Sequence, residues 1–563
     1  MSAVSAPPMG PALDIHALVA GYAPHPCRSS QSASAFAPSF FFGPAAFWAS
    51  AARSAAAKNA GAGPGDVLMT ERPDRIRLTP DLEISRLVCG LWQVADIEKN
   101  GTTIDPDMGA DALQAYARNG FDTFDMADHY GSAEVITGRL LSRYPNAPRP
   151  VAFTKWCPEP GPMTRDIVRR GVEERLTRLG VERIDLLQFH WWTFQHPAWL
   201  DALNEMQRLK QEGLIGALGL TNFDAGHLAL ALSDGIEITT NQVSFSLVDR
   251  RAAGALSDLC QKRGVKLLAY GSLCGGFLSE KWLGAPEPET IPDWSRSKYK
   301  RFIDTAGGWA AFQGILEAAS RIARRHHVSL SNVASRWVLE HPAVAATIIG
   351  ARLGENEHRG DNLNVFGFSL DAQDHADLNE AFAATQPIPG DCGDEYRKPP
   401  FLTASGDLSH HLSAIPSIYT AEPVPGRPGR SRVSSGSIWE PIAGYSRAVR
   451  VGNRIHVSGT TATHAADRCV APGDAGAQAT YILDKIAASI AALGGSMEDV
   501  VRTRVYLRDA SQWEPVSRAH GRVFGTVLPA NTMMEAGNLI GDYAVEIEAE
   551  AICDGAAGGS ISL

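Results

Sequence analysis

The sequence has little positive charge and few cysteines for its length. Its 563 residues include 52 Lys and Arg against 62 Asp and Glu, a formal net charge of −10 at pH 7. A general binder of the nucleic-acid backbone needs the opposite sign, so we expect no nucleic-acid partner. The eight cysteines form no CxxC pair and are too few for a disulfide scaffold of this size, which indicates reduced thiols in an intracellular compartment.

The sequence also lacks a good membrane span. The stretch Ser29–Ala52 is uncharged and rich in Phe, but two prolines and a glycine interrupt it, so we expect no stable membrane insertion. Two interpretations of residues 1–68 are open. Ala33–Pro38 resembles the cleavage motif of bipartite plastid-targeting presequences, which favours a transit peptide and a plastid location. The alternative is a disordered extension before an internal start at Met69, in a cytoplasmic protein.

What the sequence does contain is a regular alternation of strand and helix patterns from residue 84 to about 368, which is typical of parallel βα units. Eight β-rich apolar runs occur: Arg86–Trp92, Phe121–Ala127, Val151–Trp156, Ile184–His190, Ile215–Phe223, Ile238–Ser246, Val265–Leu273 and Val344–Arg352. Eight units in about 250 to 300 residues fit one barrel better than two open sheets. An open dinucleotide-binding sheet needs a GxGxxG after its first strand, and none is present there. We therefore predict a (β/α)8 TIM barrel over residues 69–385.

The predicted strand ends carry an unusual set of polar residues. Asp125, Lys155 and His190 end three successive strands, and Tyr130 lies in the loop after the first of these. In such barrels the C-terminal ends of the strands form the catalytic site. A Lys ammonium stabilises a phenolate, an Asp keeps that ammonium charged, and a neutral imidazole can polarise a carbonyl oxygen. The set predicts proton delivery to a carbonyl oxygen, and a nicotinamide cofactor must then supply the hydride, because side chains cannot.

Other strand ends offer groups for that cofactor. Asn222 and Gln242 can hold a carboxamide, and Tyr270 can stack on the nicotinamide ring. Arg352, at the end of the eighth predicted strand, offers a guanidinium to a ribose 2′-phosphate, which favours NADP over NAD.

The segment Gly120–Gly131, which reads GFDTFDMADHYG and is followed by Glu134 and Gly138, resembles the signature of the aldo-keto reductases. The resemblance covers about residues 72–385 and implies an NADP-dependent carbonyl reductase. It implies that Tyr130 is the general acid/base, that Lys155 and Asp125 tune it, and that His190 orients the substrate. It further implies contacts to nicotinamide and to the adenosine phosphate, here from Thr221, Asn222, Gln242, Tyr270, Gly350, Arg352, Glu355, His358 and Asn362.

Two tryptophans are candidates for the substrate pocket. We expect Trp92 and Trp191 to line an aromatic pocket, and ordinary core positions are the alternative. A second hypothesis for the whole barrel is a non-catalytic subunit that senses a nicotinamide nucleotide. The presence of both Tyr130 and Lys155 argues against that hypothesis.

Residues 386–437 contain eight prolines and no apolar period, which predicts a connector. Within it, Asp391–Arg397 clusters carboxylates with a thiol, but the spacing matches no standard metal loop. We expect a solvated turn that packs against the barrel, and no metal site. Residues 438–554 alternate strand and helix patterns and predict a compact α+β domain, with a flexible tail at 555–563.

This second domain resembles the Rid/YjgF family, which has a chorismate-mutase-like fold, through GYSRAV at 444–449, VSGT at 457–460, PANT at 529–532 and VEIEA at 545–549. The resemblance implies a pocket containing Tyr445, Glu546 and the residue at 531. Imine-hydrolysing members have an Arg where this chain has Asn531, and a neutral amide cannot form the charged bidentate pair with a carboxylate. We expect a binding or oligomerising module, and the family's usual trimers imply a homotrimer.

Overall fold

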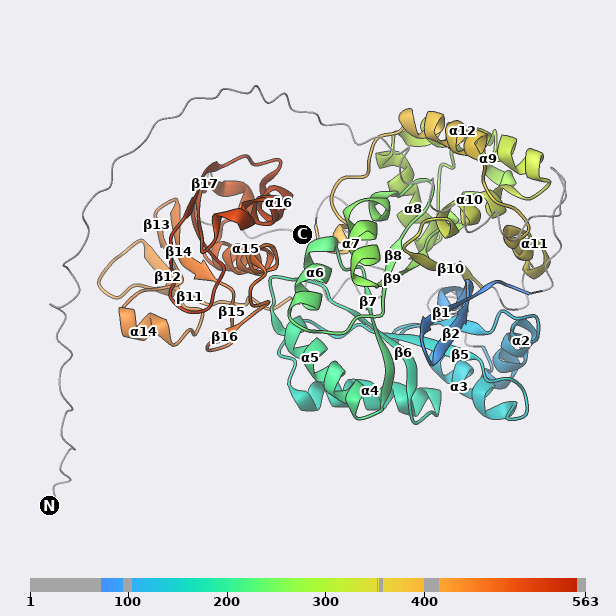
Figure 1. Cartoon of the computed structure of the whole chain (residues 1–563), viewed down its shortest axis with the longest axis horizontal. Helices are drawn as coiled ribbons and strands as arrows, with labels where there is room; N and C mark the ends of the chain where they lie inside the picture. The colour runs from blue at the N-terminus through green and yellow to red at the C-terminus, as the bar shows by residue number, and fades with distance from the viewer. Residues whose placement is uncertain (1–71, 95–103, 352, 354–357, 399–414, 554–563) are drawn as a thin grey trace, which may run out of the picture. The chain divides into compact units, whose positions relative to one another are not determined.

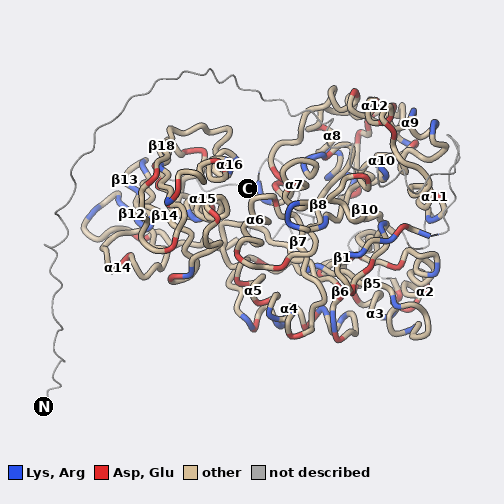
Figure 2. The backbone as a smooth tube through the Cα atoms, viewed as in Figure 1, with Lys and Arg blue, Asp and Glu red and all other residues tan. Residues whose placement is uncertain are grey.

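The computed structural model describes residues 72–94, 104–351, 353, 358–398 and 415–553. The predictions for residues 1–68, for Arg352 and Glu355, and for the tail at 555–563 lie outside these ranges. No helix among the described residues is long and apolar enough to cross a membrane. Figure 2 shows basic and acidic residues interspersed along the described chain rather than gathered in blocks of one sign.

Eight parallel strands close into a barrel, which confirms the predicted fold class (Figure 1). Hydrogen bonds join them in the order β10-β3-β4-β5-β6-β7-β8-β9. Closure comes from β10 beside β3, with Thr347 opposite Leu87. The strands are β3 (Leu87–Gly90), β4 (Thr123–Asp125), β5 (Val151–Trp156), β6 (Ile184–His190), β7 (Ile215–Thr221), β8 (Thr240–Ser244), β9 (Lys266–Tyr270) and β10 (Val344–Gly350).

Helices alternate with these strands and surround the barrel (Figure 1). Local sequence signals set their ends. The Thr164 hydroxyl caps α4 by accepting a hydrogen bond from the Ile167 N–H, and Gly180 ends the same helix in the left-handed conformation, at a φ of 61°. The helices are α2 (Pro106–Arg118), α3 (Ala133–Arg143), α4 (Arg165–Leu179), α5 (Ala198–Gln211), α6 (Ala225–Ser233), α7 (Ala255–Arg263), α8 (Trp294–Thr305), α9 (Gly308–His326), α10 (Leu330–Leu339), α11 (Arg359–Leu363) and α12 (Ala372–Ala383).

The barrel interior is a packed core rather than a pore. The hairpin of β1 (Arg75–Thr79) and β2 (Leu82–Ser85) precedes the barrel and adds Leu82 and Ile84 to a buried cluster. Phe153, Leu186 and Leu268 from the barrel strands belong to the same cluster. These side chains exclude water from the interior, as in other barrels of this class.

The C-terminal region forms a seven-stranded sheet in the order β11-β12-β13-β14-β19-β17-β18. All neighbours are antiparallel except β17 and β18, which are parallel. The helix α15 (Ala475–Ala492) packs on β14 and β19 and against α16 (Trp513–Phe524), so the predicted α+β class is confirmed. The remaining elements are β11 (Ala421–Pro423), β12 (Arg430–Val433), α14 (Trp439–Ala443), β13 (Ala448–Val451), β14 (Arg454–Thr461), β15 (Thr463–His464), β16 (Arg468–Cys469), β17 (Val500–Leu507), β18 (Ala530–Glu535) and β19 (Val545–Ile552).

The predicted connector at 386–437 needs a correction, because β11 and β12 lie inside it and belong to this sheet. Their residues are almost all exposed or half-buried, so no apolar alternation marks them in the sequence. Pro423 is tolerated because β11 is the edge strand, where one backbone N–H needs no partner.

We predict that Phe153→Ala lowers the stability of the barrel by about 3–5 kcal/mol, since Phe153 is fully buried in the interior cluster and its loss leaves a cavity. Differential scanning calorimetry of the full chain would show a lower midpoint for the barrel transition. Val501→Ala, at a side chain that is 43% exposed, is the control and should leave the midpoint nearly unchanged. Equal shifts in the two variants would contradict a packed interior.

Candidate active site

A cavity of about 660 Å³ lies among the C-terminal ends of the barrel strands. It brings together residues from all eight strands and from the loops that follow them. The predicted site residues that line it are Trp92, Asp125, Tyr130, Lys155, His190, Thr221, Asn222, Gln242, Tyr270, Gly350, His358 and Asn362.

A buried ion pair lies in the wall of this cavity. The Lys155 Nζ donates to Asp125 Oδ2 at 2.7 Å and to the Met126 carbonyl at 2.8 Å. Each charged residue of the pair is only 3% exposed. The other carboxylate oxygen of Asp125 accepts from the side-chain amides of Gln188 and Gln242, at 2.9 and 2.8 Å. The carboxylate is therefore fully hydrogen-bonded, as a buried charge requires.

Tyr130 stands next to this pair. The Lys155 ammonium lies 4.9 Å from the centre of the Tyr130 ring. Trp92 packs edge-on against the same ring at 4.9 Å between centroids, and His129 does so at 4.8 Å. The phenol thus has an ammonium group beside it and two aromatic neighbours packed against its ring.

His190 is held as a neutral imidazole. Burial, and then the positive charge of Arg397, keep the pKa of His190 well below its ordinary value. Its Nε2 is buried and has no hydrogen-bond partner among the described residues. A buried ring nitrogen without a partner in a cavity wall can bind a polar ligand atom.

Other buried polar atoms in the cavity wall also lack a hydrogen-bond partner among the described residues. Thr221 Oγ1, Ser272 Oγ and Gln93 Oε1 are buried and without a hydrogen-bond partner within the described ranges. Nearby, the Tyr270 hydroxyl donates to Asn222 Oδ1 at 2.8 Å, which ties two of the predicted cofactor residues together. This polar lining fits a ligand that is itself rich in hydrogen-bonding groups, as a nicotinamide nucleotide is.

Cations gather around the same cavity and were not anticipated from the sequence. None of them follows a strand end directly, so strand-end analysis could not find them. They are Lys281, Arg296, Lys298, Arg301 and Arg359. Such a set suits the phosphate groups of a nucleotide.

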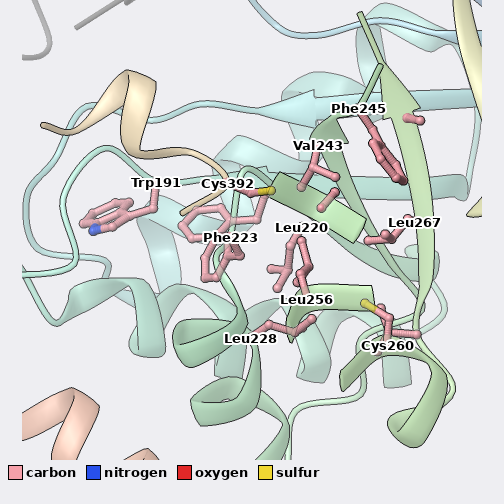
Figure 3. Close-up of a cluster of buried hydrophobic side chains, with 14 of the residues drawn as sticks. Trp191, Leu220, Phe223, Leu228, Val243, Phe245, Leu256, Cys260, Leu267 and Cys392 are labelled. Atoms are coloured by element: carbon pink, nitrogen blue, oxygen red, sulfur yellow. The ribbon is translucent and has the colours of Figure 1, made fainter. Parts of the chain in front are cut away.

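Trp191 corrects one of our predictions, because it does not line the cavity. It is fully buried in the core (Figure 3), and its indole N–H donates to the carbonyls of Thr193 and His196. Its neighbour Trp192 lines the cavity instead, 4.5 Å from the His190 ring. Side chains alternate between faces along a strand, so the residue two after an inward residue is the better candidate.

The segment after the barrel supplies another wall that sequence analysis missed. Tyr396 lines the cavity with its ring 5.4 Å from the His190 ring, and Lys298 Nζ donates to its hydroxyl at 2.5 Å. Glu395, which is 1% exposed, pairs with Arg251 at 2.9 Å. Arg397 donates to the carbonyls of Asn222 and Trp191. The turn predicted here is therefore anchored on the barrel and forms part of its site, not only its surface.

The predicted pocket residues of the C-terminal domain do not all meet within one chain. Burial raises the pKa of Glu546 on β19, while the nearby Arg447 opposes that rise. The Arg447 guanidinium lies 5.6 Å from the Tyr445 ring, so these three residues form one group. Asn531 lies on β18, separated from β19 by β17, and its side chain donates to Thr503 instead.

Two protein-family models match the chain. The model described as "Aldo/keto reductase family" matches residues 86–383, more than half of the chain. The model described as "Endoribonuclease L-PSP" matches residues 436–553.

Several individual proteins are similar to part of this chain. The flagellar radial spoke protein 5 of Chlamydomonas reinhardtii is 35% identical over 191 residues, which are 30% of this chain, and the match covers only 36% of that protein. The NADH-specific methylglyoxal reductase of Escherichia coli is 24% identical over 330 residues, covering 55% of this chain and 98% of that enzyme. Among solved structures, a glycerol dehydrogenase from Gluconobacter oxydans is 26% identical, with a TM-score of 0.48 over 56% of this chain and 98% of that one.

We predict that Asp125→Leu destabilises the barrel by about 3–5 kcal/mol at pH 7, because it leaves the Lys155 ammonium buried without its partner. The double variant Asp125→Leu with Lys155→Met removes both charges and should recover most of the loss. Thermal unfolding of the full chain measures both effects. The exposed pair Glu514–Arg518 offers the control, and Glu514→Gln should change stability by less than about 0.5 kcal/mol. A double variant no more stable than the single one would contradict this account.

Proposed function

Because the chain belongs to the aldo/keto reductase family, whose members are oxidoreductases that use nicotinamide cofactors, we propose that it reduces an aldehyde or ketone with NADPH. The observation that carries the proposal is one cavity lined by Tyr130, Lys155 and His190, with Asp125 paired to the lysine. This arrangement supports proton transfer from Tyr130 to a carbonyl oxygen bound in the cavity.

In the proposed reaction, Tyr130 donates its phenolic proton to the carbonyl oxygen. A phenol has an ordinary pKa near 10 and needs help to release a proton at neutral pH. The Lys155 ammonium, 4.9 Å from the ring, stabilises the phenolate that remains. Asp125 keeps this ammonium charged and fixed, so it acts through Lys155 rather than on the substrate.

His190 has a different task in this proposal. Its imidazole stays neutral because burial disfavours the charged form. In the tautomer that carries its proton on the unpartnered Nε2, His190 can donate to the same carbonyl oxygen, which polarises the carbonyl and fixes its orientation. Trp92, Trp192 and Tyr396 surround this position with aromatic surface, which favours an apolar or aromatic body on the substrate.

When bound, a nicotinamide cofactor supplies the hydride. Asn222, Gln242 and Tyr270 would hold its nicotinamide end, with Thr221 Oγ1 as a further donor. Ser272 and the cavity cations would hold its phosphates. We propose NADPH over NADH because of Arg352 and these cations, although the Escherichia coli relative is named NADH-specific.

We predict that the full chain oxidises NADPH in the presence of aldehydes and that Tyr130→Phe slows turnover by about 10²–10⁴-fold. Absorbance of the reduced cofactor measures turnover, and its fluorescence measures binding, which the variant should retain. Tyr144→Phe, whose hydroxyl contacts Asp111 away from the cavity, is the matched control. A parallel series with NADH tests the cofactor preference.

Other outcomes of this experiment select among the alternatives. NADPH binding without turnover on any carbonyl would favour the nucleotide-sensing subunit. Faster turnover with NADH would overturn the assignment of the cations to a 2′-phosphate while leaving the reductase in place. Full activity in Tyr130→Phe would remove the proposed proton donor.

We also propose that the C-terminal domain binds or oligomerises rather than hydrolysing imines, and that it assembles as a homotrimer. Within one chain, Asn531 is two strands away from Glu546, so a second copy is needed to bring such positions together across an interface. The strand β18 lies at the edge of its sheet and exposes Met534, which is 48% exposed. An open edge strand with apolar side chains is suited to association.

We predict that light scattering of the full chain gives a mass of three times 60.3 kDa. Met534→Asp should shift the mass towards that of one chain, because it places a charge on the exposed edge. Val135→Lys on α3, at a side chain that is 42% exposed, is the control and should leave the mass unchanged. A single-chain mass for the unaltered protein would contradict the trimer.

A further inference from the structure

A second cluster of reactive side chains lies beside Tyr130 and has no part in the proposed hydride and proton transfer. It consists of Asp128 and His129 from the loop after β4 and Cys157 from the loop after β5. One donor atom from each residue, a carboxylate oxygen, an imidazole nitrogen and the thiol sulfur, lies within 4.8 Å of the other two. His129 and Cys157 line the cavity, and Asp128 lies behind them.

The cluster is held in place by its own hydrogen bonds. His129 Nδ1 and Asp128 Oδ1 are 2.9 Å apart. The Cys157 N–H donates to the other carboxylate oxygen of Asp128, also at 2.9 Å. Asp128 and His129 are each 14% exposed at the side chain, and Cys157 is 7% exposed. These contacts join two loops from different βα units, so the three donor atoms are held close together before any ligand binds.

The donor set and its spacing match one class of ligand. Carboxylate oxygen, imidazole nitrogen and thiolate sulfur together are typical ligands of Zn²⁺. The ligands of a tetrahedral zinc ion are about 3.3–3.7 Å apart, so rotations that move these donors by about an ångström would suffice. Three protein ligands with a fourth position facing a cavity is the pattern of an open zinc site.

The charges around the cluster permit a cation there. The positive charge of Arg175 acts on Asp128, but Arg175 is paired with Glu134 at 3.7 Å and with Glu174 at 2.8 Å. Arg178 donates to the Asp128 backbone carbonyl and is likewise paired with Glu134. The positive charges of these two arginines are therefore shared with the carboxylates of Glu134 and Glu174, which weakens their repulsion of a cation bound at Asp128.

We propose that Asp128, His129 and Cys157 form a binding site for Zn²⁺ in the wall of the catalytic cavity. Binding forms a Zn–S bond as the Cys157 thiol proton leaves to solvent, and the imidazole binds in its neutral form. The ion takes the place of the hydrogen bond between His129 Nδ1 and Asp128 Oδ1. No oxidation or reduction is involved.

The site would block the reaction proposed above, a consequence that rests on that function. The His129 ring packs against Tyr130, and Cys157 clusters with Trp192 and Tyr396. An ion held between these residues occupies the space next to the phenol and adds a second positive charge there. Zinc should therefore inhibit the reductase reversibly, and a chelator should restore its activity.

The binding test needs no substrate and so is independent of the reductase. The full chain, without an affinity tag and with its thiols reduced, is titrated with Co²⁺, which reports thiolate ligation by a charge-transfer absorption in the near ultraviolet. We expect this band to saturate at one equivalent and to vanish when Zn²⁺ is added. Cys157→Ser should abolish the band, and Asp128→Asn or His129→Gln should weaken Zn²⁺ binding by about tenfold or more.

The cavity offers a matched control. Cys89 is a second thiol that lines it, on β3. Cys89→Ser should keep the band, and circular dichroism of every variant checks that it has folded. The proposal is overturned if the unaltered chain gives no band, if Cys157→Ser keeps it, or if Cys89→Ser removes it. Several weak equivalents of Co²⁺ unaffected by all three site variants would mean an adventitious ion only.

A second measurement separates this proposal from the proposed function. If NADPH turnover is found, Zn²⁺ should inhibit it, and the inhibition constant should match the dissociation constant from the Co²⁺ competition. If the chain proves to have no reductase activity, the cobalt band still tests the metal site alone. Inhibition by Zn²⁺ that persists unchanged in Asp128→Asn would contradict an action through this cluster.

Discussion

The pairing of β10 with β3 is the constraint on which the rest of the catalytic domain depends. It turns eight parallel strands into a closed ring, with no exposed edge among them. Closure forces the C-terminal ends of all eight strands towards one rim. Residues as distant in the chain as Asp125 and Gln242 are hydrogen-bonded at 2.8 Å for this reason. The barrel topology therefore determines which residues meet in the site, and their side chains then determine its chemistry.

Closure also explains how a buried ion pair survives. A lysine and an aspartate removed from water lose several kcal/mol each in hydration, and only a fully satisfied geometry offsets that loss. The ring of strands supplies it: Gln188 and Gln242 from two other strands donate to Asp125, and the Met126 carbonyl accepts from Lys155. The barrel thereby holds the Lys155 ammonium next to Tyr130, where a solvent-exposed lysine would be screened and mobile.

The sequence was sufficient to predict the barrel, its eight strands and twelve of the residues that line the cavity, because strand ends follow from apolar periodicity and the loop residues follow from the family resemblance. The boundaries were less exact: Phe121–Ala127 was predicted as a strand, but only Thr123–Asp125 pairs in the barrel. The prediction for Trp191 was wrong by one residue. Side chains alternate between the two faces of a strand, so Trp192 faces the cavity and Trp191 is buried in the core. The cavity positions of Tyr396 and Lys298 and the cluster of Asp128, His129 and Cys157 could not be predicted, because residues distant in the sequence come together there. β11 and β12 were hidden by their polar surfaces.

The anchoring of residues 394–397 on the barrel bears on how such a fusion can change during evolution. The family match ends at residue 383, yet Tyr396 belongs to the wall around His190 and is fixed there by Glu395 and Arg397. Recombination at residue 383, where the family match ends, would replace residues 394–397 together with the C-terminal domain. The wall around His190 and the sequence that leads into the C-terminal domain therefore share a single short stretch of chain.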